Sequence, residues 1–175
     1  ALRRLEKGDP AIRREDHLLI VGFNHSIHEV QNHLRENSEG EPPQIVVVLP
    51  VAESKLRDEV RRALAGYPSR TTVVAADPGD DGFQRVCAAE ARGIVLLSPV
   101  GDPDAADLEV TSRATLLEGF LDRAGARPPV AVEFRRGRNV RAFWEPDPEG
   151  LISRFPDNFD ALVNDRNIGA ILAVA

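Results

Sequence analysis

The sequence predicts an α/β fold: a Rossmann-like, doubly wound, mostly parallel sheet with helices on both faces and a C-terminal helical tail. Two observations carry this prediction. Short β-branched runs alternate strictly with helix-like segments over residues 17–134, which is the pattern of βαβ units. The runs are apolar at consecutive positions, as expected for strands that helices cover on both sides. A chain of 175 residues can form one domain with a substantial core.

Each predicted element is justified by its own pattern. Five short apolar runs predict strands at 17–23, 42–50, 70–77, 92–99 and 128–134. Apolar residues at helical spacing predict helices at 26–37, 53–66, 81–91 and 105–125. In the first helix, Ile27, Val30 and Leu34 share one face. Residues 1–16 are charged and lack a clean period, so we interpret them as a linker or a short leading helix.

The last part of the chain breaks the alternation. Residues 135–150 contain glycine, proline and charge and predict a turn, whereas 151–175 predict one or two helices with a very apolar end. A terminal apolar helix needs a covering surface, so we expect it to pack on its own sheet or to cross to another subunit. The expected parts are thus a linker at 1–16, a Rossmann-like domain at 17–134, and a turn with helices at 135–175 as a dimerisation element.

Composition narrows the class of protein. The net charge of −6 argues against a nucleic-acid binder, which needs a basic face to displace counterions from phosphates. A single cysteine, Cys87, cannot form an intrachain disulfide. No apolar run reaches the ~20 residues of a membrane helix. Because the chain contains no methionine, we expect it to be a fragment of a longer protein, with room for a membrane segment before Ala1.

The loop after the first predicted strand has the shape of a dinucleotide-binding loop with one glycine left. Its three glycine positions hold Gly22, Asn24 and Ile27. In such loops the first glycine makes the turn, the second admits the pyrophosphate and the third permits close helix packing. Asn24 tolerates unusual backbone angles, whereas Ile27 either pushes the helix away or fills the phosphate space. The helix N-terminus still offers amides to an anion beside His25.

The acid that binds a ribose is expected at the end of the second strand. That strand ends in Leu49 and Pro50, and the nearest acid is Glu53. A nucleotide such as NAD would therefore lack its usual acidic contact to ribose, in addition to the glycines that admit its pyrophosphate. Two interpretations stay open: the loop binds a nucleotide or another anion through Gly22, Asn24 and His25, or the loop is structural.

Two acidic clusters follow the third and fourth predicted strands, at the carboxyl edge where such folds bind ligands. The clusters are Asp77, Asp80 and Asp81, and Asp102, Asp104 and Asp107. Close carboxylates attract hard cations such as calcium, so Asp80, Asp81, Asp102 and Asp104 are candidate metal ligands and Asp77 a candidate cofactor contact. The alternative is helix capping, because both clusters precede helices.

Three other groupings have simple alternatives. The histidines are His17, His25, His28 and His33. His25 and His28 could share a metal, but zinc needs three or four ligands, and the alternative is a set of surface histidines. The basic run is Arg135, Arg136, Arg138 and Arg141. That run could bind an anionic partner or form a solvated turn. The single cysteine, Cys87, is expected in the core. No catalytic motif appears in the sequence, so no enzyme is predicted.

Four segments together resemble one known family. Residues 2–24 resemble a linker from a pore helix into a first strand, and residues 73–99 resemble a Gly-Asp segment, helix and fourth strand. Ala76 replaces the glycine of that segment, while Asp77 matches. Residues 102–117 and 128–134 resemble the next loop, helix and strand. On these residues the chain resembles the regulatory N-terminal domain of potassium conductance proteins (the RCK or TrkA-N domain), particularly in bacterial channels related to CASTOR and POLLUX.

The resemblance implies a domain at the cytoplasmic face of the membrane, in the same chain as an ion-conducting pore. Such domains pair through their C-terminal helices, assemble into a gating ring as homo-oligomers and respond to nucleotides or calcium. The departures at Asn24, Ile27 and Ala76 favour calcium at the acidic clusters over a nucleotide. The alternatives are an NAD(P)-binding Rossmann oxidoreductase and a stand-alone nucleotide-binding regulatory subunit of a transporter.

Overall fold

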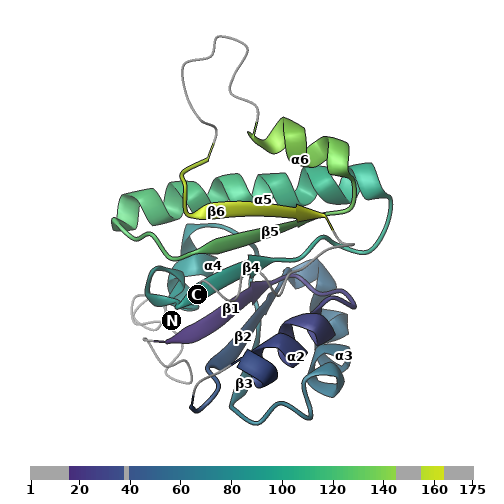
Figure 1. The fold of residues 1–175 in the computed structure, drawn as a ribbon, viewed down its shortest axis with the longest axis vertical. Coiled ribbons are helices and arrows are strands. Elements are labelled where there is room, and N and C mark those ends of the chain that lie inside the picture. The colour runs from purple at the N-terminus through teal and green to yellow at the C-terminus, as the bar shows by residue number, and fades with distance from the viewer. Residues whose placement is uncertain (1–15, 38–39, 145–154, 164–175) are drawn as a thin grey trace.

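Six parallel strands form one sheet in the computed structural model, which describes residues 16–37, 40–144 and 155–163 (Figure 1). The strands are β1 (His17–Val21), β2 (Gln44–Leu49), β3 (Thr71–Ala75), β4 (Gly93–Leu96), β5 (Val130–Phe134) and β6 (Phe159–Val163). Their order is β3-β2-β1-β4-β5-β6, and every neighbouring pair is parallel. The chain changes direction across the sheet between β1 and β4, which is the switch point of a Rossmann-like fold. The predicted fold class is confirmed.

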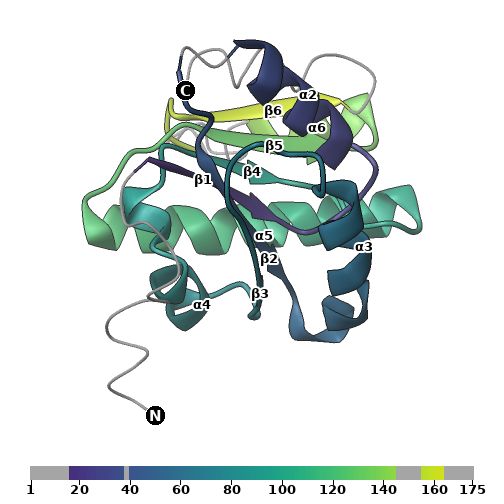
Figure 2. The same cartoon turned by 90° about the horizontal axis from the view of Figure 1, so that it is seen from below.

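Helices cover both faces of this sheet (Figure 1, Figure 2). They are α2 (Ile27–Asn37), α3 (Arg57–Ala63), α4 (Asp80–Arg85), α5 (Pro103–Ala124) and α6 (Gly137–Trp144), with 3₁₀ turns η1 (Val51–Leu56) and η2 (Ala88–Glu90). Residues of α2 and α3 share one apolar cluster, and residues of α4, α5 and α6 share the other. No helix in the described ranges combines the length and apolar character needed to cross a membrane.

Strand β1 shows why the strands are apolar throughout. Leu18 and Ile20 belong to the cluster under α2 and α3, whereas Leu19 and Val21 belong to the cluster under α4 and α5. Successive side chains of a strand point to opposite faces, so a strand between two helical layers needs apolar residues at every position. This arrangement places the carboxyl end of β1 at the centre of the sheet edge.

Two predictions for the C-terminal part of the chain are wrong. Residues 137–144 form α6 where a turn was expected, and Phe159–Val163 form β6 where a helix was expected. Both segments are ordered by aromatic packing: the Phe143 and Phe155 rings stack with centroids 4.0 Å apart, and Phe155 lies 5.3 Å from Phe159. A short apolar run next to the sheet edge is stabilised as a strand because β5 offers it a hydrogen-bonding partner, which periodicity alone cannot reveal.

The sheet therefore continues beyond residue 134 and includes part of the segment that was assigned to dimerisation. The linker at 1–15 and the apolar end at 164–175 lie outside the described residues. The predicted crossing of the terminal helix to another subunit stays a prediction.

Candidate functional site

The candidate site lies at the switch point, where the carboxyl ends of β1 and β4 meet. Gly22 follows β1 with a φ of +92°, in the region that favours glycine. A Cβ at this position would lie 2.8 Å from Arg113 Nη1 and 3.0 Å from the Leu97 carbonyl oxygen. Gly22 thus makes the turn, as predicted, and lets a side chain of α5 approach the backbone.

A buried hydrogen-bond network fills the crevice beside this turn. Glu133 of β5 is 1% exposed. Its carboxylate accepts hydrogen bonds from Asn24 Nδ2 at 2.6 Å, Ser26 Oγ at 2.5 Å and the Ser98 amide at 2.9 Å. Asn24 Nδ2 also donates to the Ser98 carbonyl oxygen at 2.7 Å. The loop after β1, the loop after β4 and the carboxyl end of β5 are thereby joined around one carboxylate.

The first amides of α2 already have acceptors inside the loop. The Ser26 amide donates to Asn24 Oδ1 at 2.8 Å, and the Ile27 amide donates to the Asn24 carbonyl oxygen at 3.3 Å. The His28 amide donates to the His25 carbonyl oxygen at 3.2 Å. These groups were expected to be available to an anion, and in the structure they are engaged. Ile27 itself is fully buried in the core under α2, so it packs against the sheet.

Arg113 closes the other side of the switch point. It rises from α5 with a side chain that is 3% exposed, and its Nη2 donates to Glu53 Oε1 at 3.1 Å and to Glu109. Glu53 is the acid nearest to the position where a dinucleotide fold binds ribose. Here its carboxylate forms an ion pair with a buried arginine, so both charges are used inside the protein.

Neither Glu133 nor Arg113 was predicted as a site residue. A signal for both was present. Glu133 interrupts the apolar run of β5, and Arg113 falls three residues after Val110 and four before Leu117 on the buried face of α5. A charged residue at a core position must be paired or hydrogen-bonded, because burying an unpaired charge is costly. A charged residue at a position where the pattern predicts a buried apolar residue is therefore a candidate site residue.

The other predicted cofactor contacts lie apart from this network. His25 is exposed at the start of α2. Asp77 Oδ1 accepts a hydrogen bond from the Val51 amide at 2.9 Å, which joins the end of β3 to the start of η1. Among the four histidines, His17 is buried at the opposite, amino end of β1, with Nε2 3.0 Å from the Val86 carbonyl oxygen. Cys87 is buried in the core, as predicted.

The candidate calcium ligands have partners of other kinds. Asp80 pairs with Arg123 at 2.5 Å, and Asp81 is exposed in the first turn of α4. Asp102 caps α5, where its side chain accepts from the amides of Asp104 and Ala105 at 3.1 and 3.0 Å. No group of three or more His, Cys, Asp or Glu side chains within residues 16–37, 40–144 and 155–163 is arranged to hold a metal ion. Calcium stays a prediction, without a preformed site in those ranges.

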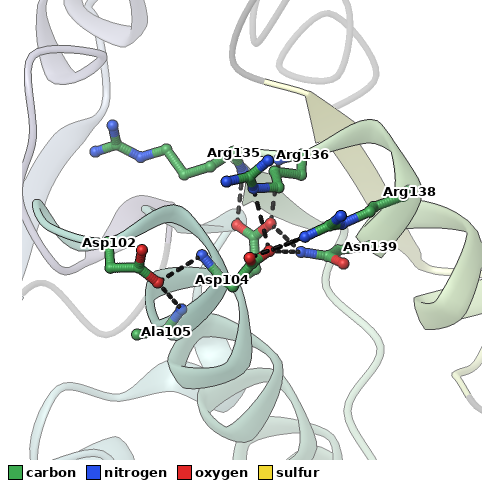
Figure 3. Close-up of polar contacts among 8 residues, drawn as sticks. Asp102, Asp104, Ala105, Arg135, Arg136, Arg138 and Asn139 are labelled. Atoms are coloured by element: carbon green, nitrogen blue, oxygen red, sulfur yellow. Dashed lines mark hydrogen bonds and ion pairs between the residues drawn. The ribbon is translucent and has the colours of Figure 1, made fainter.

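The second acidic cluster and the basic run bind each other (Figure 3). Arg138 Nη2 lies 2.8 Å from both oxygens of Asp104, and Arg136 Nε lies 3.1 Å from Asp104 Oδ1. The hydrogen bond from Arg138 lowers the pKa of the Asp104 carboxyl, and the same bond raises the pKa of Arg138. The two features were predicted separately and are one surface feature with paired charges.

Asp107 forms the buried part of the same contact. Its carboxylate accepts from the amides of Arg135 and Arg136 at 2.7 and 3.1 Å and from Asn139 Nδ2 at 2.7 Å. It therefore joins the first turns of α5 to the start of α6. The role of Asp107 is to hold two helices together at the carboxyl edge.

Comparison with known proteins adds no relative. No family model matches the chain, and the curated proteins give no significant match. The fold and the site together define a Rossmann-like α/β domain in which buried side chains at the switch point hydrogen-bond to one another.

Proposed function

We propose that the chain is a non-catalytic regulatory domain of a cation channel, located at the cytoplasmic face of the membrane. Two things support the proposal. Its sequence resembles the regulatory domains of potassium conductance proteins over four separate segments, and its fold is of the Rossmann-like class that this resemblance implies. The observation that carries the regulatory part is the switch point itself. One carboxylate, Glu133, ties the loop after β1 to β4 and β5, so a movement of any one of them displaces the others.

The mechanism is energetic coupling between a ligand and a pore. A ligand that binds one conformation of an assembled ring more tightly shifts the population toward that conformation. A ten-fold difference in affinity between the two conformations supplies about 1.4 kcal/mol to the pore equilibrium. Residues 1–16 would transmit the change as a linker.

The proposal is tested on the full-length protein in lipid vesicles. Potassium flux is measured with and without calcium and with and without NAD, and a chain from which residues 17–163 are deleted serves as control. We expect a ligand-dependent flux in the full-length protein alone. A full-length protein without cation flux, or a deletion that responds to the same ligand equally, would contradict the proposal.

Self-association is the second part of the proposal. Sedimentation of this chain at increasing concentration is expected to show a dimer or a larger ring. A chain that stays monomeric at high concentration would count against ring assembly and leave the channel assignment to the flux experiment.

A nucleotide-dependent protein is the second candidate function, either an oxidoreductase or a regulatory subunit of a transporter. The strand order and the left-handed turn at Gly22 favour it. Thermal unfolding with NADH tests for nucleotide binding, because a ligand at a hundred times its Kd adds ~2.7 kcal/mol to stability. The flux experiment then separates a nucleotide-gated channel from this candidate. A clear rise in Tm with NADH would support this candidate.

A further inference from the structure

Glu133 is a charged group at an unusual place. It lies one residue before the carboxyl end of the otherwise apolar strand β5, and its partners in the described part of the chain are Asn24, Ser26 and Ser98, none of which carries a positive charge. All three donate, two from side chains and one from the backbone. The donors reach both carboxylate oxygens, Ser26 at Oε1 and Asn24 and Ser98 at Oε2, which is how proteins bind the oxygens of an acidic group. The structure thus places an acidic side chain of the protein itself among three converging donors.

The position of this acidic side chain coincides with a ligand position of the fold. In open α/β sheets ligands bind at the switch point beyond the carboxyl ends of the strands, with anionic groups at the N-terminus of the following helix. Ser26 directly precedes α2, and Ser98 lies two residues after β4. A hydroxyl group, a side-chain amide and a backbone amide are also the donors that bind phosphate oxygens.

We propose that Glu133 occupies the anion position of the switch-point crevice and excludes phosphate-bearing ligands from it. Exclusion has two causes. The three donors that would receive a phosphate are already hydrogen-bonded, and a second negative charge beside a buried carboxylate is repelled at low dielectric. Glu133 is therefore a specificity-determining residue that acts against nucleotides. This inference concerns the crevice alone and holds whether or not the chain regulates a channel.

The competing explanation is that Glu133 only ties the core together. The two explanations differ in what they expect once the carboxylate is removed. If Glu133 only stabilises the core, its removal lowers the stability of the protein and no added anion restores that stability. A built-in anion leaves a cavity with three converging donors, which formate or phosphate can fill.

The test uses the present chain with Glu133→Ala and follows thermal unfolding in sodium formate, phosphate or pyrophosphate against sodium chloride of equal ionic strength. We expect Glu133→Ala to lower Tm and the added anion to restore part of the loss in a saturable manner. A rise of ~2–4 °C is expected when the anion is at about five times its Kd. The unsubstituted chain is expected to show no anion-specific rise.

The matched control is Val132→Ala, which also removes a buried side chain from β5. It is expected to lower Tm without any anion-specific recovery. Glu133→Gln keeps the shape of the side chain and removes its charge, so it decides the question if Glu133→Ala does not fold. We expect pyrophosphate to raise the Tm of Glu133→Gln, because a neutral amide holds the three donors less strongly than the carboxyl group does. This rise should be smaller than that of Glu133→Ala, because glutamine keeps the shape of the side chain.

Two results would overturn the inference. One is a pyrophosphate-specific rise in Tm for the unsubstituted chain, since Glu133 would then not exclude phosphate. The other is a folded Glu133 variant whose Tm responds to formate, phosphate and pyrophosphate no more than that of Val132→Ala.

Discussion

At the scale of single residues, Gly22 has two separate reasons to be glycine. Its φ of +92° is strained for a residue with a Cβ, and the space for that Cβ is taken by Arg113 and the Leu97 carbonyl. We expect Gly22→Ala to lower the free energy of unfolding by about 2 kcal/mol or more, because strain and the displacement of a buried ion pair add. Urea denaturation measures this loss.

The control for Gly22 is Gly66→Ala. A Cβ at Gly66 would meet only the Gln31 side chain, at 3.9 Å, so this substitution is expected to change stability little. Equal losses for the two variants would contradict the reading of the turn.

Tyr67 gives a clean spectroscopic prediction, because it is the only tyrosine in the chain. Burial raises its pKa from 10.0 to about 12, and its hydroxyl donates to the Pro43 carbonyl oxygen at 2.9 Å. The folded-state pKa is the higher one, so the stability it contributes is complete below pH 10 and is lost as the pH rises toward 12. Absorbance of the tyrosinate ion should show a midpoint near 12 in the folded protein.

The same titration in denaturant is expected to return the tyrosine midpoint to about 10. The variant Tyr67→Phe should lose the part of the alkaline fall in stability that this side chain causes. A midpoint near 10 in the folded chain would show that the hydroxyl is open to solvent.

Residue identity could be predicted best where a rule ties one residue type to one conformation. Gly22 was identified from the turn alone, whereas Asp102 was predicted as a metal ligand with helix capping as the alternative, and the structure shows the cap. Glu133 and Arg113 were missed because their roles depend on partners that are distant in sequence: Ser26 and Ser98 for Glu133, and Glu53 for Arg113. Local patterns cannot show which distant donor meets a buried charge.

At the scale of elements, α5 is the longest helix that the structure describes, and its start is defined by one side chain. Asp102 accepts from two of the first amides, and Pro103 follows at the first helical position. We expect Asp102→Ala to lower the free energy of unfolding by about 1 kcal/mol, since those amides lose their acceptor. Chemical denaturation provides the measurement.

Ser112→Ala is the matched control for the cap. Ser112 is exposed in the middle of the same helix, where alanine has the higher helix propensity, so stability is expected to stay equal or to rise slightly. If Asp102→Ala behaves like Ser112→Ala, the cap contributes nothing and the acidic residue must have another role.

Elements could be predicted well where their pattern was long or buried on both faces. β1, β2 and β4 fall within the expected ranges for that reason, and α5 starts two residues before its expected range of 105–125. α6 and β6 were missed because each is short and one-sided. The stacked rings of Phe143 and Phe155 hold α6 close to the start of β6, although the two residues are separated in the sequence.

At the scale of the whole molecule, the sheet continues past β5 to β6 within the described residues. Phe134 packs edge to face on Phe143 with centroids 5.1 Å apart, and Phe159 lies in the same cluster. We expect a chain that stops after residue 136 to melt at lower temperature than the whole chain and to bind a hydrophobic dye, because these rings lose their cover. Calorimetry and dye fluorescence measure the two effects.

An unchanged Tm for the shortened chain would support the predicted domain boundary at residue 134. Point variants give a second view of the same boundary. Phe155→Ala is expected to cost about 3–5 kcal/mol if the aromatic cluster is part of the core, and much less if β6 is only an attached edge.

The central pairing of β1 with β4 has a consequence for how the protein is made. Leu18 pairs with Gly93, and α2, β2, α3, β3 and α4 lie between them in the chain. During synthesis the β4 side of β1 therefore stays an open strand edge until the ribosome has released most of the domain. Open edges recruit other chains. We therefore expect a nascent chain of this topology to be most prone to aggregate in the interval before β4 has been translated.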